Sequence, residues 1–370
     1  MRRNNNPQQI SLFDSANDRR STRERERERE RERRFGLRHT YNNITSFDNL
    51  LLSWQEFLCG KRKRKDVTEF SLKFMDNLLL LHTELINKTY RHGGYTAFKI
   101  NDPKPRDIHK ASVRDRLLHH AIYRILYPYF DCKFIFDSYS CRIGKGTHRA
   151  MNRFRSFHWI VSKNNTRTVW VLKCDIRKFF ANIDHNVLKD ILAKSIGDSD
   201  VLWLLGQIID SFDSGRKGVG LPLGNLTSQL LVNIYMNEFD HFAKRELKVK
   251  YYIRYADDFV VLSEDKFELE KLLPKIAEFL QAKLMLELHP DKVYIKTFAS
   301  GVDFLGWIHF SDHRVLRNTT KWRMYRKFFD HPSNEAYQSY LGILQYGNTD
   351  KIEQELDRLY ENGGIINKKD

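Results

Sequence analysis

The stretch "YIRYADDFVV", residues 252–261, places two adjacent carboxylates between two runs of strand-forming residues. Ile253 and the two valines favour a pleated strand, whereas Asp257 and Asp258 belong to a residue type that is depleted from strands and favoured in tight turns. The pattern predicts a β-hairpin with both aspartates at its tip. An aspartate pair in a turn is common without any chemistry, so the rest of the chain must decide whether these two have a function.

The composition indicates a globular protein with a polyanionic partner. The chain has 370 residues, of which 41% are hydrophobic and 13% aromatic, enough for one large domain or two ordinary ones. Its formal net charge of +16 favours phosphate contacts, which makes nucleic acid the leading partner. A basic protein of the membrane surface is the alternative, but we find no apolar run of about 18 residues and no signal peptide, so we expect a cytoplasmic protein with no membrane partner. The four cysteines show no C-x-x-C spacing, so neither a zinc site nor a disulfide framework is expected.

The chain begins with a segment of unusual composition. Residues 1–38 contain "RERERERERERR" (residues 23–34), which has no apolar face to bury and is either disordered or a solvated helix with weak Arg–Glu pairs. We expect residues 1–38 to form a flexible tail without a catalytic role. The composition then becomes globular. One amphipathic helix is predicted by apolar residues at helical spacing, namely Phe70, Phe74, Leu78, Leu81 and Leu85. The strands and helices that follow indicate an α+β fold with an antiparallel sheet.

A third aspartate lies at the end of another predicted strand. The segment "TVWVLKCDI", residues 168–176, is rich in β-branched residues and reaches Asp175 near its end. If this strand and the hairpin are neighbours in one sheet, Asp175 lies close to Asp257 and Asp258. Clustered carboxylates repel one another, and a divalent cation relieves that repulsion. Two magnesium ions held by oxygen ligands catalyse phosphoryl transfer, so three aspartates in a basic chain predict a polymerase palm.

A series of motifs from about residue 43 to residue 320 resembles the reverse transcriptases, in the order typical of that family. The segments that resemble the family are "ASVRDRLLHHAI" and "DSYSCRIGKGTHRAM" (fingers), "LKCDIRKFFANIDH" (first metal motif), "GLPLGNLTSQ" (template and nucleotide loop), "YADD" (catalytic hairpin), and "LELHPDKVYI" and "GVDFLGW" (last palm and primer-grip motifs). The resemblance implies a right-hand polymerase with fingers and palm over residues 39–310 and a short helical thumb over residues 311–370. Its expected function is DNA synthesis from a primer on an RNA template, with deoxynucleoside triphosphates and two Mg²⁺ ions.

The resemblance also implies roles for residues near the metal. Asp175, Asp257 and Asp258 would hold the two magnesium ions, with help from the carbonyl oxygen of Ile176. Lys292 matches the family's late-palm lysine, which is proposed to protonate the leaving pyrophosphate. A surface lysine is the alternative for that position.

Further residues are implied in binding nucleotide and template. Lys99 and Arg106, seven residues apart on a predicted fingers strand, would pair with the triphosphate, and a solvated face is their alternative. Phe180 would form the wall that excludes a 2′-hydroxyl, although core packing is possible for it and Phe179 shares the ambiguity. The remaining residues implied are Leu223, Gly224 and Gln229 at the nucleotide and Arg142 and Asn225 at the template RNA.

Two positions depart from the common pattern of the family. Most reverse transcriptases have a glutamine before the glycine of the loop motif and Ser-Pro at its end, whereas this chain has Leu223 before Gly224 and Gln229 after Ser228. Both departures resemble the reverse transcriptases of diversity-generating retroelements, which copy RNA with frequent errors opposite adenine. Their mutated cDNA replaces part of a target gene. This resemblance implies a bacterial, archaeal or phage-encoded enzyme with a small, basic, helical accessory protein.

Two kinds of alternative remain. A group II intron-like, retron or phage-defence reverse transcriptase would share the polymerase motifs, although we expect neither a maturase nor an endonuclease extension in this chain. A catalytically idle RNA-binding scaffold would share the fold alone, and the three aspartates argue against it.

Overall fold

The computed structural model describes residues 40–100, 105–330 and 333–362, so the predicted tail over residues 1–38 lies outside the described residues. The described chain forms two compact units, each assembled from segments that are distant in sequence. Unit 1 consists of residues 40–92, Val113–Phe134 and Ile191–Ile208. Unit 2 consists of Gly93–Ser112, Ile135–Asp190 and residues 209–362.

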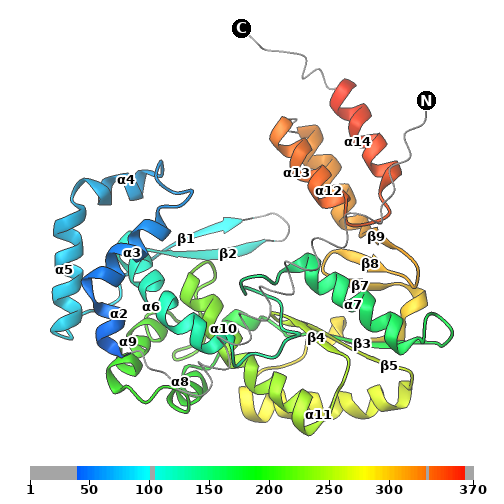
Figure 1. The fold of residues 1–370 in the computed structure, drawn as a ribbon, viewed down its shortest axis with the longest axis horizontal. Helices are drawn as coiled ribbons and strands as arrows, with labels where there is room; N and C mark the ends of the chain where they lie inside the picture. The colour runs from blue at the N-terminus through cyan, green and yellow to red at the C-terminus, as the bar shows by residue number, and fades with distance from the viewer. Residues whose placement is uncertain (1–39, 101–104, 331–332, 363–370) are drawn as a thin grey trace, which may run out of the picture. The chain divides into compact units, whose positions relative to one another are not determined.

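Unit 1 is helical. Leucines from four of its helices are fully buried, among them Leu50, Leu81, Leu118 and Leu204. A further helix, α8 (His185–Ala193), crosses from unit 2 into unit 1. The helices of unit 1, shown from blue to cyan and in green in Figure 1, are α2 (Tyr41–Thr45), α3 (Phe47–Phe57), α4 (Lys65–Leu72), α5 (Phe74–Ile86), α6 (Val113–Asp131) and, except for its last residue, α9 (Ser199–Ile209).

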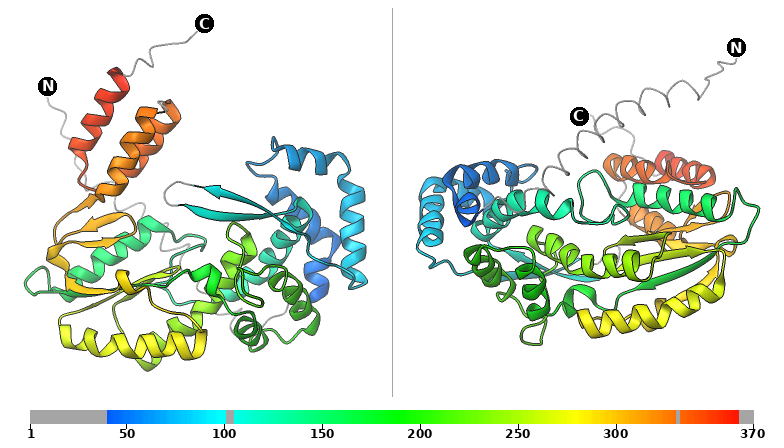
Figure 2. Two further views of the ribbon diagram at one scale, coloured as in Figure 1. Left: turned by 180° about the vertical axis from the view of Figure 1, so that it is seen from behind. Right: turned by 60° about the horizontal axis from the view of Figure 1, so that its bottom comes forward.

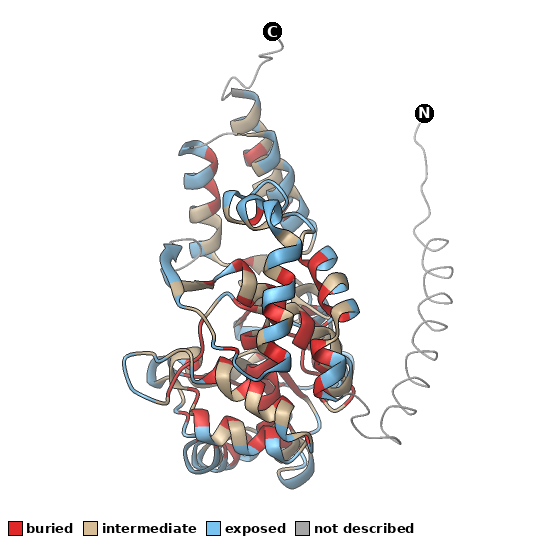
Figure 3. Ribbon diagram, turned by 90° about the vertical axis from the view of Figure 1, so that its left-hand side faces the viewer, coloured by how far each residue is buried: buried red, intermediate tan, exposed pale blue. Residues whose placement is uncertain are grey.

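The amphipathic helix predicted through Phe70 and Phe74 is broken into α4 and α5. Lys73, between them, has φ −122° and ψ 38°, outside the helical region. The break allows the rings of both phenylalanines to contact Trp54, with centroids at 5.3 Å and 4.8 Å. The side-chain amide of Asn77 donates to the carbonyl of Phe70 at 3.1 Å, which satisfies an acceptor freed by the break. The opposite face of α5 is exposed, pale blue in Figure 3.

Unit 2 is built around an antiparallel sheet with strand order β4-β5-β3-β6. β3 is paired with β5 and with β6, and β4 forms a hairpin with β5, so every pairing in this sheet is antiparallel, as predicted. The strands are β3 (Trp170–Asp175), β4 (Tyr252–Tyr255), β5 (Asp258–Ser263) and β6 (Tyr294–Thr297).

Helices cover both faces of this sheet, as Figures 1 and 2 show. On one face, Phe154 of α7 (Thr147–Val161) belongs to a buried cluster with Val171 and Val260. On the other face, Phe259 contacts Phe239 of α10 (Leu226–His241), with ring centroids at 5.0 Å. Helix α11 (Lys266–Leu284) covers the same face. The sheet is therefore packed against helices on both of its faces.

The other elements of unit 2 are two smaller sheets, three C-terminal helices and four short helical segments. All of the strand pairs in the smaller sheets are antiparallel. These elements are the hairpin β1 (Tyr95–Ile100) and β2 (Arg106–Ala111), the sheet of β7 (Val302–Phe304), β8 (Trp307–His309) and β9 (Arg314–Leu316), the helices α12 (Asn318–Asp330), α13 (Asn334–Leu344) and α14 (Asp350–Asn362), the 3₁₀ segments Phe179–Asn182, Pro290–Lys292 and Phe298–Ser300, and the π segment Phe242–Glu246.

The C-terminal helices occupy the segment predicted to be a short helical thumb. Their core includes Met324 and Leu344 together with Trp307 of β8 and Met151 of α7. In the part of the chain that the structure describes, no helix combines the length and the apolar character needed to cross a membrane.

Candidate active site

The structure brings the three predicted catalytic aspartates to one end of the central sheet. Asp175, the last residue of β3, is paired with Asp258, the first residue of β5. Because cross-strand partners share a face of the sheet, these two side chains leave the same face. Asp258 is also paired with Tyr255 of β4, which leaves Ala256 and Asp257 in the turn. The predictions of a hairpin and of a neighbouring strand that ends in Asp175 are confirmed. Of the two aspartates predicted at the tip, Asp257 lies in the turn and Asp258 is the first residue of β5.

Backbone hydrogen bonds fix this end of the sheet. The N–H of Ile176 donates to the carbonyl of Asp257 at 3.1 Å, so the end of β3 is tied directly to the hairpin turn. On the other side of β3, the carbonyl of Asp175 accepts from the N–H of His289 at 2.8 Å. The backbone at the end of β3 is therefore hydrogen-bonded to neighbouring segments on both sides, which fixes the position of Asp175.

Two lysines contact the aspartates. The Nζ atom of Lys292 lies 2.8 Å from Oδ1 of Asp175. The Nζ atom of Lys173 lies 3.3 Å from Oδ2 of Asp258, and Lys173 is buried. Sequence analysis missed Lys173. The signal was a lysine inside an apolar strand, two residues before Asp175 and therefore on the same face.

The electrostatics of the site favour protonation of two of the carboxyl groups. Burial raises the pKa of Asp258 to about 7; Lys173 offsets part of this rise, and the charges of Asp175 and Asp257 add to it. Burial also raises the pKa of Asp257, with a further contribution from Asp175, while Lys292 and Arg106 lower it. Positive charge at this end of the sheet would therefore stabilise the ionised aspartates.

The chemistry of the donor atoms suits a hard divalent cation. Oδ1 of Asp258 is buried and has no hydrogen-bond partner among the described residues, so an acceptor is available inside the site. Carboxylate and carbonyl oxygens are the ligands that Mg²⁺ prefers. However, no three Asp, Glu, His or Cys side chains of the described residues are arranged as a ready ligand group. Lys292 and Lys173 each contact a carboxylate oxygen here, Lys292 on Asp175 and Lys173 on Asp258.

The hairpin β1–β2 separates the two cations predicted to bind the triphosphate. Lys99 and Arg106 lie on two paired strands and not on one, and Lys99 is opposite Asp107 whereas Arg106 is opposite Ile100. Neighbouring rungs of a ladder direct their side chains to opposite faces. A shared phosphate site for the two is therefore not supported. Arg106 is the better candidate, because its charge acts on Asp257.

Phe179 and Phe180 lie in the short helix after β3 and differ in burial. Phe179 is only 3% exposed and belongs to the core, whereas Phe180 is half-buried. Their rings meet edge to face at 5.6 Å. The carbonyl of Phe180 accepts from the N–H of Leu221 at 2.8 Å, which ties it to the loop before α10. Of the two rings, therefore, only that of Phe180 is exposed enough to contact a ligand.

The loop before α10 is fixed against β2. The carbonyl of Leu223 accepts from the N–H of His109 at 3.0 Å, and the Leu223 side chain is half-buried. Gly224 has φ +107°, and a Cβ atom there would lie 2.8 Å from Cγ2 of Ile108. Only glycine allows this close approach of the loop to the strand. Gln229, half-buried, follows in the first turn of α10.

Asn225 and Arg142, the predicted template contacts, are both buried and bonded to backbone. The Asn225 side chain donates to the carbonyl of His109 at 2.8 Å and accepts from the N–H of Ala111 at 3.3 Å. Arg142 donates to the carbonyls of Ile135 and Ser138 at 2.7 and 2.9 Å. These contacts favour a structural role for both, so we do not retain them as template contacts.

A buried arginine supports the catalytic turn. Arg254, within the YADD hairpin, is fully buried and donates to both carboxylate oxygens of Asp240 at 2.8 and 2.6 Å. It also donates to the carbonyl of Ala256 in the turn at 3.1 Å. Tyr252 donates to Asp240 at 2.7 Å. Sequence analysis missed this network, although an arginine inside an apolar strand was a visible signal.

Comparison with known proteins gives matches over a large part of the chain. A family model described as reverse transcriptase (RNA-dependent DNA polymerase) matches residues 99–309. Protein YkfC of Escherichia coli K12 is 26% identical over 300 residues, which cover 70% of this chain and 76% of YkfC. The group II intron-encoded protein LtrA of Lactococcus lactis is 23% identical over 289 residues, which cover 60% of this chain and 46% of LtrA.

Two telomerases are among the solved structures that match this chain. Apo telomerase from Candida tropicalis matches with a TM-score of 0.49 and 13% identity, over 72% of this chain and 56% of that chain. Telomerase from Candida albicans in complex with a fragment of telomeric RNA matches with a TM-score of 0.48 and 11% identity, over 75% and 56% of the respective chains. The chain thus spans little more than half of either telomerase and less than half of LtrA. The family model, by contrast, covers more than half of this chain, which therefore belongs to the reverse transcriptase (RNA-dependent DNA polymerase) family.

Proposed function

We propose that this protein is an RNA-directed DNA polymerase that extends a primer with deoxynucleoside triphosphates. The observation that supports this most is the meeting of Asp175, Asp257 and Asp258 at the paired ends of β3 and β5. The net charge of +16 supports a nucleic-acid substrate. We infer an intracellular site of action, since template and nucleotides are found there.

Each residue at this end of the sheet has a proposed task. Asp175, Asp257 and Asp258, with the carbonyl of Ile176, would hold the metal. Two bound Mg²⁺ ions would activate the primer hydroxyl and stabilise the charge on the leaving oxygen. Lys292, on the rim at Asp175, would deliver a proton to the leaving pyrophosphate.

Two further residues would position the nucleotide. Arg106 would bind its phosphates, and Phe180 would contact its sugar and exclude a 2′-hydroxyl. Their exposure supports these roles, since Arg106 is exposed on β2 and Phe180 is half-buried.

The experiment is primer extension on an RNA template with Mg²⁺, in the wild type and in Asp257→Asn. We expect extension by the wild type and none by the variant, with RNA affinity nearly unchanged, because one ligand is lost but the basic surface remains. Asp291→Asn is the matched control, an exposed aspartate next to Lys292 that should keep full activity. A wild type that binds RNA but never extends a primer would instead identify an idle RNA-binding scaffold.

We further propose that synthesis is error-prone opposite template adenine and serves the diversification of a target gene. Leu223 and Gln229 support this, because a leucine offers the nascent base pair only shape. The hydrogen bond from the N–H of His109 to the carbonyl of Leu223 fixes the backbone of the loop. A fixed backbone would hold the Leu223 side chain in one position against the nascent base pair. A small, basic, helical accessory protein that helps bind the RNA belongs to this proposal.

Leu223→Gln tests the error-prone proposal. An amide adds a donor and an acceptor that only one pair geometry satisfies, and an unpaired buried polar group costs about 1 to 3 kcal/mol. We expect roughly a fivefold to hundredfold gain in discrimination, at 1.36 kcal/mol per decade, larger opposite adenine than opposite the other bases. Sequencing of cDNA copied from one RNA measures it, with Leu223→Met as the control of similar volume. An unchanged adenine error rate would remove Leu223 as the determinant.

A second candidate is a reverse transcriptase of the group II intron type. The similarity to LtrA, a group II intron-encoded protein, favours it. The DNA next to the coding sequence distinguishes the two. An imperfect repeat pair that differs at adenines, beside a small accessory reading frame, supports the first proposal, and flanking intron RNA sequence supports the second.

A further inference from the structure

A cavity of about 240 Å³ lies in unit 2, away from the end of the sheet where the aspartates meet. Its walls come from α7, the turn between β8 and β9, and the loop between α13 and α14, all labelled in Figure 1. The lining residues that matter here are Arg155, Phe310, His313, Arg314, Tyr346 and Asn348. This volume is several times the roughly 30 Å³ that a water molecule occupies in the liquid.

Local bonds hold the walls in place. The loop between α13 and α14 is bonded to β9, because the N–H of Asn348 donates to the carbonyl of Arg314 at 2.9 Å and Nε of Arg314 donates to the carbonyl of Tyr346. In the β8–β9 turn, the N–H of Phe310 donates to the carbonyl of His313 at 2.8 Å, and their rings stack at 4.7 Å. The cavity is therefore formed before any ligand arrives.

Positive charge in the cavity is not neutralised by the protein. Arg155 donates to the carbonyl of Asp312 at 3.4 Å, and Arg314 donates to the side-chain oxygen of Asn152 at 3.2 Å, both neutral acceptors. Neither arginine forms an ion pair with a described residue, and no described acidic residue lines the cavity. Asp312, at the turn, is bonded to His313 at 2.7 Å.

The two arginines also repel each other. Burial lowers the pKa of Arg314, and the charge of Arg155 lowers it further. Three other arginines of unit 2 differ in this respect, because Arg153, Arg167 and Arg317 are each paired with a carboxylate. An anion between Arg155 and Arg314 would remove the repulsion and supply charge-assisted hydrogen bonds.

We propose that this cavity binds a backbone phosphate of the RNA on which the enzyme acts, outside the catalytic centre. The proposal rests on the proposed function only in taking nucleic acid as the substrate. Arginine suits phosphate because its guanidinium donates in a planar fork. The stacked Phe310 and His313 rings offer a flat face to the adjoining sugar or base.

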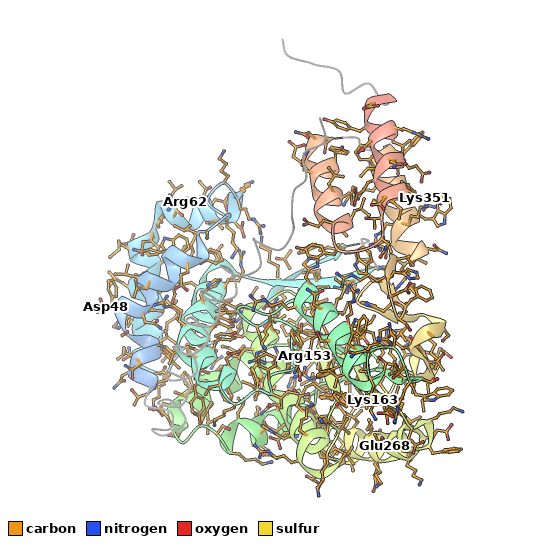
Figure 4. All side chains as sticks on the ribbon, turned by 45° about the vertical axis from the view of Figure 1, so that its right-hand side comes forward. Asp48, Arg62, Arg153, Lys163, Glu268 and Lys351 are labelled. Atoms are coloured by element: carbon orange, nitrogen blue, oxygen red, sulfur yellow. The ribbon has the colours of Figure 1, made fainter. Side chains whose placement is uncertain are left out.

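Arg155→Gln tests the proposal through the salt dependence of RNA binding. Each phosphate contact adds about 0.7 (single strand) to 0.9 (duplex) to the slope of log K against log salt. We expect Arg155→Gln to lower the slope by about that amount and Arg155→Lys to restore most of it, in fluorescence anisotropy with a labelled RNA. Arg167→Gln is the matched control, since Arg167 is an exposed arginine that is paired with Glu264. Lys163, which is labelled in Figure 4, is paired with the same glutamate.

A second variant places a negative charge in the cavity without changing its shape. Asn348→Asp keeps the acceptor that Asn348 offers to the N–H of Arg314 at 3.4 Å. We expect it to weaken RNA binding and at the same time to raise Tm, because the new carboxylate relieves the repulsion between Arg155 and Arg314. A variant that merely damages the fold would lower both.

Three outcomes would overturn the proposal. The first is an unchanged slope in Arg155→Gln, and the second is an equal loss in Arg167→Gln, which would show a general effect of charge. The third is a Tm shift with inorganic phosphate that Arg155→Gln abolishes while the RNA slope is unchanged, which would identify a site for free phosphate. Primer extension on a short template keeps this test separate from the proposed function. RNA binding with the expected slopes but no extension would refute the polymerase proposal and leave the phosphate site standing.

Discussion

Phe179 and Phe180 are neighbours in sequence with different surroundings, and this difference predicts different effects of truncation. Phe180→Ala should admit ribonucleotides, because the sugar loses the wall against which a 2′-hydroxyl clashes. We expect discrimination to fall at least tenfold, about 1.4 kcal/mol. Phe179→Ala should instead destabilise the fold by about 3 to 5 kcal/mol, as is typical of a buried phenylalanine. Paired rates for ribo- and deoxynucleotides, with urea unfolding, measure both effects, and the reverse assignment would show that Phe179 is the wall.

The charges on the β1–β2 hairpin lead to a second prediction at the scale of single residues. A hydrogen bond to a charged group contributes about 1.5 to 3 kcal/mol. Arg106→Ala should therefore raise KM for deoxynucleotides roughly tenfold to a hundredfold. Lys99→Ala is the matched control, because Lys99 leaves the opposite face of the same hairpin. Steady-state kinetics at saturating template measures this, and equal effects of the two variants would contradict the assignment.

The sequence predicted the three aspartates of the site, but it did not predict the basic residues that contact and support them. Asp175, Asp257 and Asp258 could be found because three carboxylates that meet at strand ends repel one another, which indicates a metal, and because the motifs around them resemble those of one family. Lys173 and Arg254 were missed because their partners, Asp258 and a distant aspartate on α10, are decided by tertiary contacts and not by local pattern.

At the scale of elements, the hairpin β4–β5 depends on Arg254, which links Asp240 on α10 to the carbonyl of Ala256 in the turn. Arg254→Lys should keep the charge pair with Asp240 but lose the bond to the turn, since a lysine has no planar fork. We expect primer extension to fall more than stability does, with a higher Mg²⁺ requirement. The measurements are kcat, the Mg²⁺ concentration at half-maximal rate, and Tm.

Arg153→Lys controls for the change of arginine to lysine. Arg153, labelled on α7 in Figure 4, is paired with Asp137 at 2.8 Å and does not contact the turn. Full activity of Arg254→Lys, or a loss that simply follows unfolding, would show that Arg254 does not position the turn.

The elements themselves were predicted unequally, for physical reasons. The strand that ends in Asp175 and the β4–β5 hairpin follow from local propensity. The break at Lys73 does not, because it is stabilised by the contacts of Phe70 and Phe74 with Trp54. The register of the β1–β2 hairpin could not be predicted from the sequence either. It decides which face of the hairpin each side chain leaves, because a shift of one residue moves every side chain of a strand to the other face.

At the scale of the whole molecule, the compact units cut across the linear order of the chain. The predicted division at residue 310 follows motifs, whereas unit 1 gathers three separated segments and unit 2 includes the three C-terminal helices. Such long-range grouping depends on tertiary packing, which the order of motifs does not specify. Fingers and palm over residues 39–310 and thumb over residues 311–370 remain a proposal about function.

The net charge of +16 makes a prediction for the molecule as a whole, because it combines contributions from the N-terminal segment and the rest of the chain. Residues 23–34 alternate arginine with glutamate and offer no apolar side chain for docking, so they should influence attraction to RNA and not the chemistry. Deletion of residues 1–34 should therefore leave kcat on a short primer and template unchanged and lower the salt dependence of RNA affinity. Anisotropy between about 50 and 200 mM salt and extension rates on the same preparation measure the two effects. A soluble, folded deletion variant with no activity would show that this segment takes part in catalysis.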